Sequence, residues 1–308
     1  MKKHKICKIL LVILAIFLCV AFYELLGICV AYKKQPEVSN TTKKETKNGS
    51  WNECSENTER AVIIEKNPEA LLQRVRLIKN AKKEIILSTF AFQSDESGKL
   101  ILGALHDAAD RGVHIRLLVD GMESWIDMEG NPYFYGLSSH ENVEIKLYNK
   151  ANPLKPWKMM GRMHDKYLIA DGKRYILGGR NTYNYFLGDF PGHKNYDRDV
   201  LVVCDEPEKE NSVNQLSEYF ETIWEQEDSG YFHDNKKLAN RKSVKNAVLE
   251  LQNGYQKYFE ENKERICETD YTDETFETEK IALVSNPIHT GSKEPVVWYQ
   301  LGELMKNA

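Results

Sequence analysis

Apolar and polar positions divide the chain into an apolar N-terminal run, a polar stretch and a long patterned body. Residues 6–32 form the apolar run, in which Glu24 is the one charge after Lys8, and a helix of this length can cross a hydrocarbon layer of about 30 Å. Residues 35–58 are polar, rich in Asn, Thr and Lys, and lack apolar periodicity, which predicts a tether. The folded body is expected to begin near Arg60.

Short apolar runs alternate with helical patterns through the body. Strands are predicted at 61–64, 84–92, 113–121, 143–148, 164–170, 174–178 and 199–204. Helices are predicted at 67–82, 100–112 and 212–226. Gly112 stands where a glycine commonly ends a helix, immediately before a strand. The alternation predicts an α/β fold in which a sheet has helices on its faces. Phe220 and Trp224 are predicted to be core residues of the last helix.

The C-terminal residues repeat an earlier segment. Residues 295–308 align with 68–81 at an offset of 227 residues, with identities that include Pro68/Pro295 and Asn80/Asn307. The first copy leads into the strand at 84–92, whereas the sequence ends with the second copy. We therefore expect two similar halves, the second of them incomplete. The predicted divisions are an anchor at 1–34, a linker at 35–58, a first domain at 59–232, a charged helical connector at 233–280 and the start of a second half at 281–308.

The N-terminal run is interpreted as an uncleaved signal anchor. Lysines precede it, and it is longer than the 7–15 apolar residues usual for a cleaved signal peptide. These lysines favour a cytoplasmic N-terminus, so we expect a single-pass protein of the cell membrane with an extracytoplasmic body. Three cysteines lie in the body, without the CxxC spacing of a zinc site. One disulfide, between Cys54 and Cys267, remains an option.

Charge narrows the choice of partner. Beyond residue 34 the chain has 36 basic and 45 acidic residues, a net charge of −9, which argues against general nucleic-acid binding. Residues 150–180 reverse this balance, with eight basic side chains against Asp165 and Asp171. A basic mouth on an acidic body should attract a small anionic headgroup. The loop at 152–163 mixes Trp and Met with Lys, which suits either a lip at a membrane interface or a loop packed on its own domain.

The segment 163–181 carries the candidate chemistry. Asp171-Gly172 between two apolar runs predicts a tight hairpin, because both positions tolerate positive φ. Alternation along the first strand puts His164 and Lys166 on one face, with Asp165 and Tyr167 on the other. A neutral imidazole can attack phosphorus, while the ammonium offsets charge on the phosphoryl oxygens. The Gly-Gly pair that follows leaves room for backbone amides to approach a phosphate, and Asn181 adds a neutral donor. His106 and His114, beside apolar residues, are interpreted as structural histidines.

The spacing His164-x-Lys166-x4-Asp171-x6-Gly178-Gly179-x-Asn181 resembles the HKD motif of the phospholipase D superfamily. The downstream DRDVLVV and the pair Phe220 and Trp224 look most like the cardiolipin synthase branch. The resemblance implies two α/β halves that each supply one motif to a shared site, without metal or cofactor. It makes His164 the nucleophile or its acid/base partner, and it assigns Lys166 and Asn181 to the phosphate.

The resemblance also gives roles to the remaining residues of the segment. Asp171 would be mainly structural, and Gly178, Gly179 and Arg180 would line the substrate site. A carboxylate is expected to fix the tautomer of the histidine, with Asp199 as first choice and Asp197 as second.

The implied function is a membrane-anchored phosphodiesterase or phosphatidyltransferase that acts on phospholipids through a phosphohistidine. The alternatives are a nuclease of the same superfamily and a non-catalytic half-protein. No second His-x-Lys-x4-Asp occurs in the 308 residues, so we expect a partner motif from a missing C-terminal half or from a homodimer.

Overall fold

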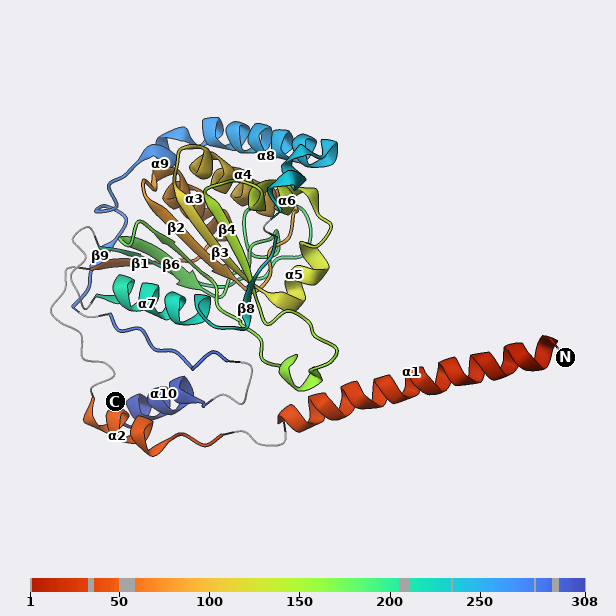
Figure 1. Ribbon diagram of the computed structural model, residues 1–308. Coiled ribbons are helices and arrows are strands. Elements are labelled where there is room, and N and C mark those ends of the chain that lie inside the picture. The colour runs from red at the N-terminus through yellow and green to blue at the C-terminus, as the bar shows by residue number, and fades with distance from the viewer. Residues whose placement is uncertain are drawn as a thin grey trace. The chain divides into compact units, whose positions relative to one another are not determined.

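The computed structural model describes residues 2–32, 36–49, 59–204, 211–233, 235–279, 281–289 and 294–307 (Figure 1). The chain divides into two compact units. The larger unit comprises Gly49–Lys150 and Met163–Val284, and the smaller unit comprises Met1–Asn48, Ala151–Arg162 and Ser285–Ala308. Each unit is described by itself below.

The larger unit is built on one mixed sheet, as the strand and helix pattern predicts. The described residues form nine strands in the order β8-β4-β3-β2-β5-β6-β7-β1-β9. The strands are β1 (Arg60–Ile64), β2 (Glu84–Thr89), β3 (His114–Asp120), β4 (Val143–Tyr148), β5 (Tyr167–Ala170), β6 (Arg174–Gly178), β7 (Asp199–Val203), β8 (Ser229–Tyr231) and β9 (Phe276–Glu277). Strands β2, β3 and β4 are parallel, and the remaining pairs are antiparallel.

Helices cover both faces of this sheet. Figure 1 shows α3 (Asn67–Asn80) and α4 (Glu96–Asp110) on one face, with α8 (Lys242–Glu261) outside α4, and α7 (Ser212–Trp224) on the opposite face. The unit also contains α5 (Gly121–Asp127), α6 (Pro132–Ser138), η3 (Lys236–Asn240) and α9 (Lys263–Cys267). The prediction for α7 is confirmed, because Phe220 and Trp224 are almost fully buried. Gly112 has φ +88° beyond the end of α4, as predicted.

The segment predicted as a connector is part of the larger unit. Helix α8 buries an apolar stripe that includes Val244, Leu251 and Phe259, and it packs against α4 and α6. Helix α9 packs on α3. The compact body therefore continues to Val284 instead of ending near residue 232. The high charge of this segment concealed a periodic apolar face, which is what binds it to the domain.

The smaller unit contains α1 (Lys2–Tyr32), α2 (Asn40–Asn48), η2 (Pro156–Lys158) and α10 (Val296–Asn307). Residues 5–30 of α1 are long and apolar enough to cross a membrane, by length and composition. Helix α2 lies in the stretch predicted as an irregular linker, and α10 is the repeat of α3. Cys54, and with it the suggested disulfide to Cys267, lies outside the described residues.

The loop at 151–162 packs against the end of α1 within the smaller unit. The Tyr23 hydroxyl donates to the Leu154 carbonyl at 2.8 Å, and a Cβ on Gly27 would collide with the Pro156 ring. Leu154 and Trp157 nevertheless remain exposed. Residues of the apolar helix thus hold the loop that precedes His164 by two residues in the chain.

Candidate active site

The turn of the β5–β6 hairpin has the predicted geometry. Asp171 has φ +56° and Gly172 has φ +62°, and the Lys173 amide donates to the Ala170 carbonyl. The Asp171 carboxylate accepts hydrogen bonds from three successive backbone amides, those of residues 82, 83 and 84, at 2.7–3.1 Å. Asp171 therefore fastens the turn to the start of the central strand β2, and its carboxylate is occupied there.

His164 and Lys166 share one face, as the alternation predicts, although regular strand begins only at Tyr167. The Lys166 ammonium lies 2.9 Å from His164 Nδ1 and donates to the His164 carbonyl at 2.7 Å. Asp165 points the other way and accepts a hydrogen bond from the Tyr219 hydroxyl of α7 at 2.8 Å. The His164 ring is exposed, whereas Lys166 is 6% exposed. An accessible imidazole is thus held beside a largely buried cation.

Phe90 completes this pair and was not predicted. Its ring lies edge-on to the His164 ring, with centroids 4.5 Å apart, and 5.4 Å from the Lys166 ammonium. Burial lowers the pKa of Lys166 to about 8, against the opposing charges of Asp165 and Asp197. The available sequence signal was the position of Phe90, which directly follows strand β2. Ligands of open α/β sheets bind at the carboxyl ends of the parallel strands, and Phe90 lies at that end.

Backbone ties position the two ends of the motif. Asp120, at the end of β3, accepts from the Met163 amide at 3.2 Å and also caps α5. Asn181 is buried, and its Oδ1 accepts from the Ala91 amide at 3.2 Å. This bond orients the Nδ2 amide group as a donor. Asp120, like Phe90, was missed, because its role depends on a neighbour far along the chain.

The backbone amides of Gly178 and Gly179 were expected to approach a phosphate, but both are engaged in hydrogen bonds within the protein. Gly178 N–H donates to the Lys166 carbonyl at 3.1 Å, and Gly179 N–H to the Arg198 carbonyl at 3.4 Å. The glycines instead permit close approach of carboxylates. A Cβ on Gly178 would collide with Asp199, and one on Gly179 with Asp197. Their small size therefore serves packing within the sheet.

Arg180, predicted to line the substrate site, is a core residue. Its guanidinium is 1% exposed and donates to Asn67 Oδ1 and to the carbonyls of Ile64 and Glu65. It also pairs with Asp199 at 3.2 Å. Burial lowers the pKa of Arg180, and the Asp199 carboxylate opposes this shift. With these donors engaged and no exposed surface, the side chain has no access to a substrate.

The two candidate carboxylates have different surroundings. Asp199 is 2% exposed, and its Oδ2 accepts from Arg74 at 2.9 Å and pairs with Arg180. Its Oδ1 has no hydrogen-bond partner among the described residues, so no hydrogen bond joins Asp199 to His164. Asp197 is half-buried beside Gly179 and raises the pKa of Lys166 by its charge. Asp197, the second choice for the carboxylate that fixes the histidine tautomer, therefore interacts electrostatically with Lys166.

Comparisons with known proteins identify the domain that contains these residues. Residues 74–224 match the family model described as "Cardiolipin synthase, PLD-like domain". Cardiolipin synthase C of Escherichia coli K12 is 29% identical over 171 residues, which are 51% of this chain and 34% of that protein. A protein of Helicobacter pylori J99 is 31% identical over 206 residues, 62% of this chain and 38% of its own length. The chain thus spans less than two fifths of these relatives.

Among solved structures, the phospholipase D family member Nuc from Salmonella typhimurium aligns with a TM-score of 0.41 and 18% identity. That alignment covers 57% of this chain and 99% of Nuc. The family model spans strands β2 to β7 and α7, and it includes the complete HKD spacing from His164 to Asp171. By the family model and the curated relatives, residues 74–224 are therefore a phospholipase D-like domain of the cardiolipin synthase-like type.

Proposed function

We propose that the protein is a membrane-anchored enzyme that cleaves or transfers the phosphatidyl group of a phospholipid through a phosphohistidine on His164. The observation that carries this proposal is the exposed His164 ring held beside the Lys166 ammonium. The phospholipase D-like domain, of a superfamily of phosphodiesterases and phosphatidyltransferases, supports it.

The chemistry follows from where the protons lie. When Lys166 donates to Nδ1, a neutral His164 ring carries its proton on Nε2, and Nε2 cannot attack. A substrate phosphate would draw the ammonium onto its oxygens. The ring could then change tautomer, losing the Nε2 proton to solvent and gaining a proton from solvent at Nδ1. Nε2 would attack phosphorus, the bond from phosphorus to the headgroup oxygen would break, and that oxygen would receive a proton from an acid. Water or a second alcohol would release the phosphatidyl group.

We propose that Asp197 is the carboxylate that holds Nδ1–H in this reactive tautomer. Its Oδ1 accepts from the Arg198 amide, whereas its Oδ2 has no hydrogen bond among the described residues. Asp199 is assigned a structural role, because it neutralises two buried guanidinium groups. Asn181 would donate to a phosphoryl oxygen.

Membrane anchoring is supported by α1 and by the loop that α1 holds. A single apolar helix of 26 residues is long enough to span a bilayer. Its end contacts residues 154–156, and the same loop leads directly to His164. The lysines before α1 favour an extracytoplasmic body.

A second motif is proposed to come from a second copy of the chain or from a further segment, because one histidine cannot serve as both nucleophile and acid on the same phosphorus. Mixing wild-type chain with equal His164→Ala chain tests the first source. For a shared site that exchanges freely, activity per wild-type chain should fall by about half, since half of the wild-type copies pair with a variant. Unchanged activity would exclude a site shared between copies.

The central test uses full-length chain in mixed micelles that contain fluorescent phosphatidylglycerol. His164→Ala should abolish formation of both cardiolipin and phosphatidic acid, together with the acid-labile phosphoenzyme. His114→Ala is the matched control, because His114 is the first residue of β3, at the other end of that strand from Asp120. Its ring bonds Glu144 of β4. Turnover in the His164 variant would refute the proposal. Cleavage of plasmid DNA in chelator, without lipid turnover, would favour the nuclease alternative instead.

A further inference from the structure

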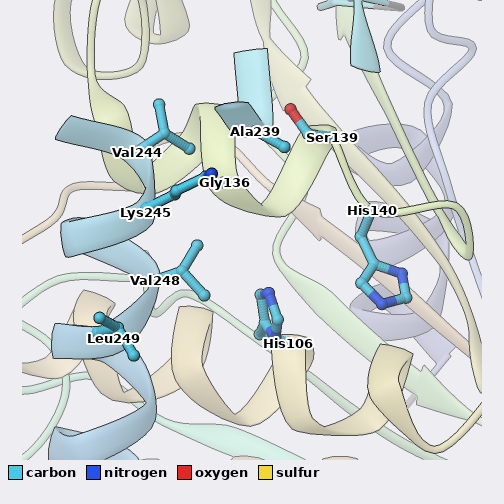
Figure 2. A pocket seen from close by; sticks show the side chains of 9 residues that line it. All are labelled: His106, Gly136, Ser139, His140, Ala239, Val244, Lys245, Val248 and Leu249. Atoms are coloured by element: carbon cyan, nitrogen blue, oxygen red, sulfur yellow. The ribbon is translucent and has the colours of Figure 1, made fainter. Parts of the chain in front are cut away.

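A cavity of about 460 Å³ lies in the larger unit among elements that carry none of the site residues. It is bounded by α4, α6, η3 and α8, and Figure 2 shows its lining. The lining consists of His106, Gly136, Ser139, His140, Ala239, Val244, Lys245, Val248 and Leu249. Its size is that of a small-molecule site.

His106, a buried histidine that lines this cavity, has one ring nitrogen without a partner among the described residues. His106 is 8% exposed, and its Nδ1 lies 3.0 Å from Asp110 Oδ2. His140 Nε2 lies 3.3 Å from the other oxygen of Asp110, and His140 Nδ1 accepts from the Asn142 amide. His140 therefore donates from Nε2, and the Asp110 carboxylate also receives Nδ1–H of His106. This leaves His106 Nε2 as an acceptor, for which the described residues provide no hydrogen bond.

The rest of the lining is apolar apart from one cation. Val244, Val248 and Leu249 form the wall on α8, and α6 meets this wall through Gly136, where a Cβ would collide with Val248. Lys245 extends from the same helix, and its ammonium has no partner among the described residues. In Figure 2 the Lys245 side chain extends from α8 toward Gly136, and the His106 ring lies next to Val248.

We propose that this cavity binds an aliphatic carboxylate, a single alkyl chain that ends in a carboxyl group. The chain would lie along the α8 wall, and the carboxyl group would lie between Lys245 and His106. Nε2 and a carboxylate are both acceptors, so binding takes up one proton from solvent. That proton lies between Nε2 and a carboxyl oxygen and extends the hydrogen-bonded series that begins at Asp110.

Other ligand classes fit these groups less well. A cationic ligand would meet the Lys245 ammonium, and a neutral hydrocarbon would leave His106 Nε2 without a partner. Transition metals need more ligands than His106 alone, because both nitrogens of His140 are already engaged.

The test is an NMR titration of ¹³C-labelled octanoate against full-length chain in phosphatidylcholine nanodiscs. We expect saturable binding that is about tenfold weaker in Lys245→Gln and in His106→Gln. Lys242→Gln is the matched control, since it removes an exposed lysine of the same helix outside the cavity. Octanol should also bind about tenfold more weakly than octanoate.

Three results would overturn the proposal. They are binding that does not saturate, octanol that binds as tightly as octanoate, and equal octanoate affinity in the wild type and Lys245→Gln. Lys245 is exposed, so its variant should fold even if His106→Gln does not. The assay measures binding alone, and its outcome is therefore independent of whether the His164 site is active.

Discussion

The protonation of Lys166 should set the alkaline limit of catalysis. Its ammonium lies against His164 and Phe90, and burial lowers its pKa from an ordinary 10.5 to about 8. Only the charged form can offset the charge of a phosphoryl group. Because a lysine is charged below its pKa, kcat/KM should fall as pH rises through about 8.

The size of the effect follows from that pKa. With a pKa of about 8, the side chain is about 90% charged at pH 7 and about 10% charged at pH 9. An ordinary lysine would remain about 97% charged at pH 9. We therefore expect kcat/KM to fall about ninefold between pH 7 and pH 9.

The measurement is headgroup exchange of phosphatidylglycerol at low substrate, where kcat/KM reports the free enzyme. Lys166→Arg is the control, because a guanidinium keeps its charge throughout this range. The variant can be less active, but its profile should be flat from pH 7 to pH 9. A flat wild-type profile, or the same alkaline fall in Lys166→Arg, would refute the reasoning.

Two further predictions separate structural from catalytic carboxylates. Asp171→Ala removes the acceptor of three backbone amides and puts alanine at φ +56°, so the free energy of unfolding should fall by about 1–3 kcal/mol. Asp171→Asn should lose less, and urea unfolding followed by circular dichroism compares the two. Activity per folded chain should survive in both, and its loss without destabilisation would contradict the structural role. Asp199→Asn should cost about 3–5 kcal/mol, because the buried Arg74 and Arg180 lose their counter-charge. If Asp199→Asn has the same free energy of unfolding as the wild type but no turnover, Asp199 is catalytic instead.

Most of the fold was predictable because its elements have strong local signals. The strand at 143–148 matches β4 at both ends, and the Asp171-Gly172 turn has both positive φ values. Short elements without periodicity were missed, including α5, α6 and the edge strands β8 and β9. Helix α8 was hidden by its exposed charges, since its buried stripe is recognised only once α4 is known to lie beneath it.

The site was predictable as far as its residues are neighbours in sequence. Alternation of two residues places His164 beside Lys166, and the structure has their side chains 2.9 Å apart. Phe90 directly follows a strand that lies more than seventy residues earlier, and no spacing rule links it to the motif. The roles given to the glycine amides and to Arg180 failed for a related reason, because hydrogen bonds to distant carbonyls use those donors.

The HKD segment therefore contains two sets of residues that its spacing alone cannot separate. Charged and small side chains suit a phosphate site, and the same side chains suit a hairpin fixed by buried ion pairs and close backbone contacts. Partner atoms distinguish the two. Asp171 bonds the amides at the start of β2, and Arg180 pairs with Asp199 in the core, whereas the His164 ring is exposed. If this division is right, substitutions in the first set should act through stability and those at His164 or Lys166 through turnover.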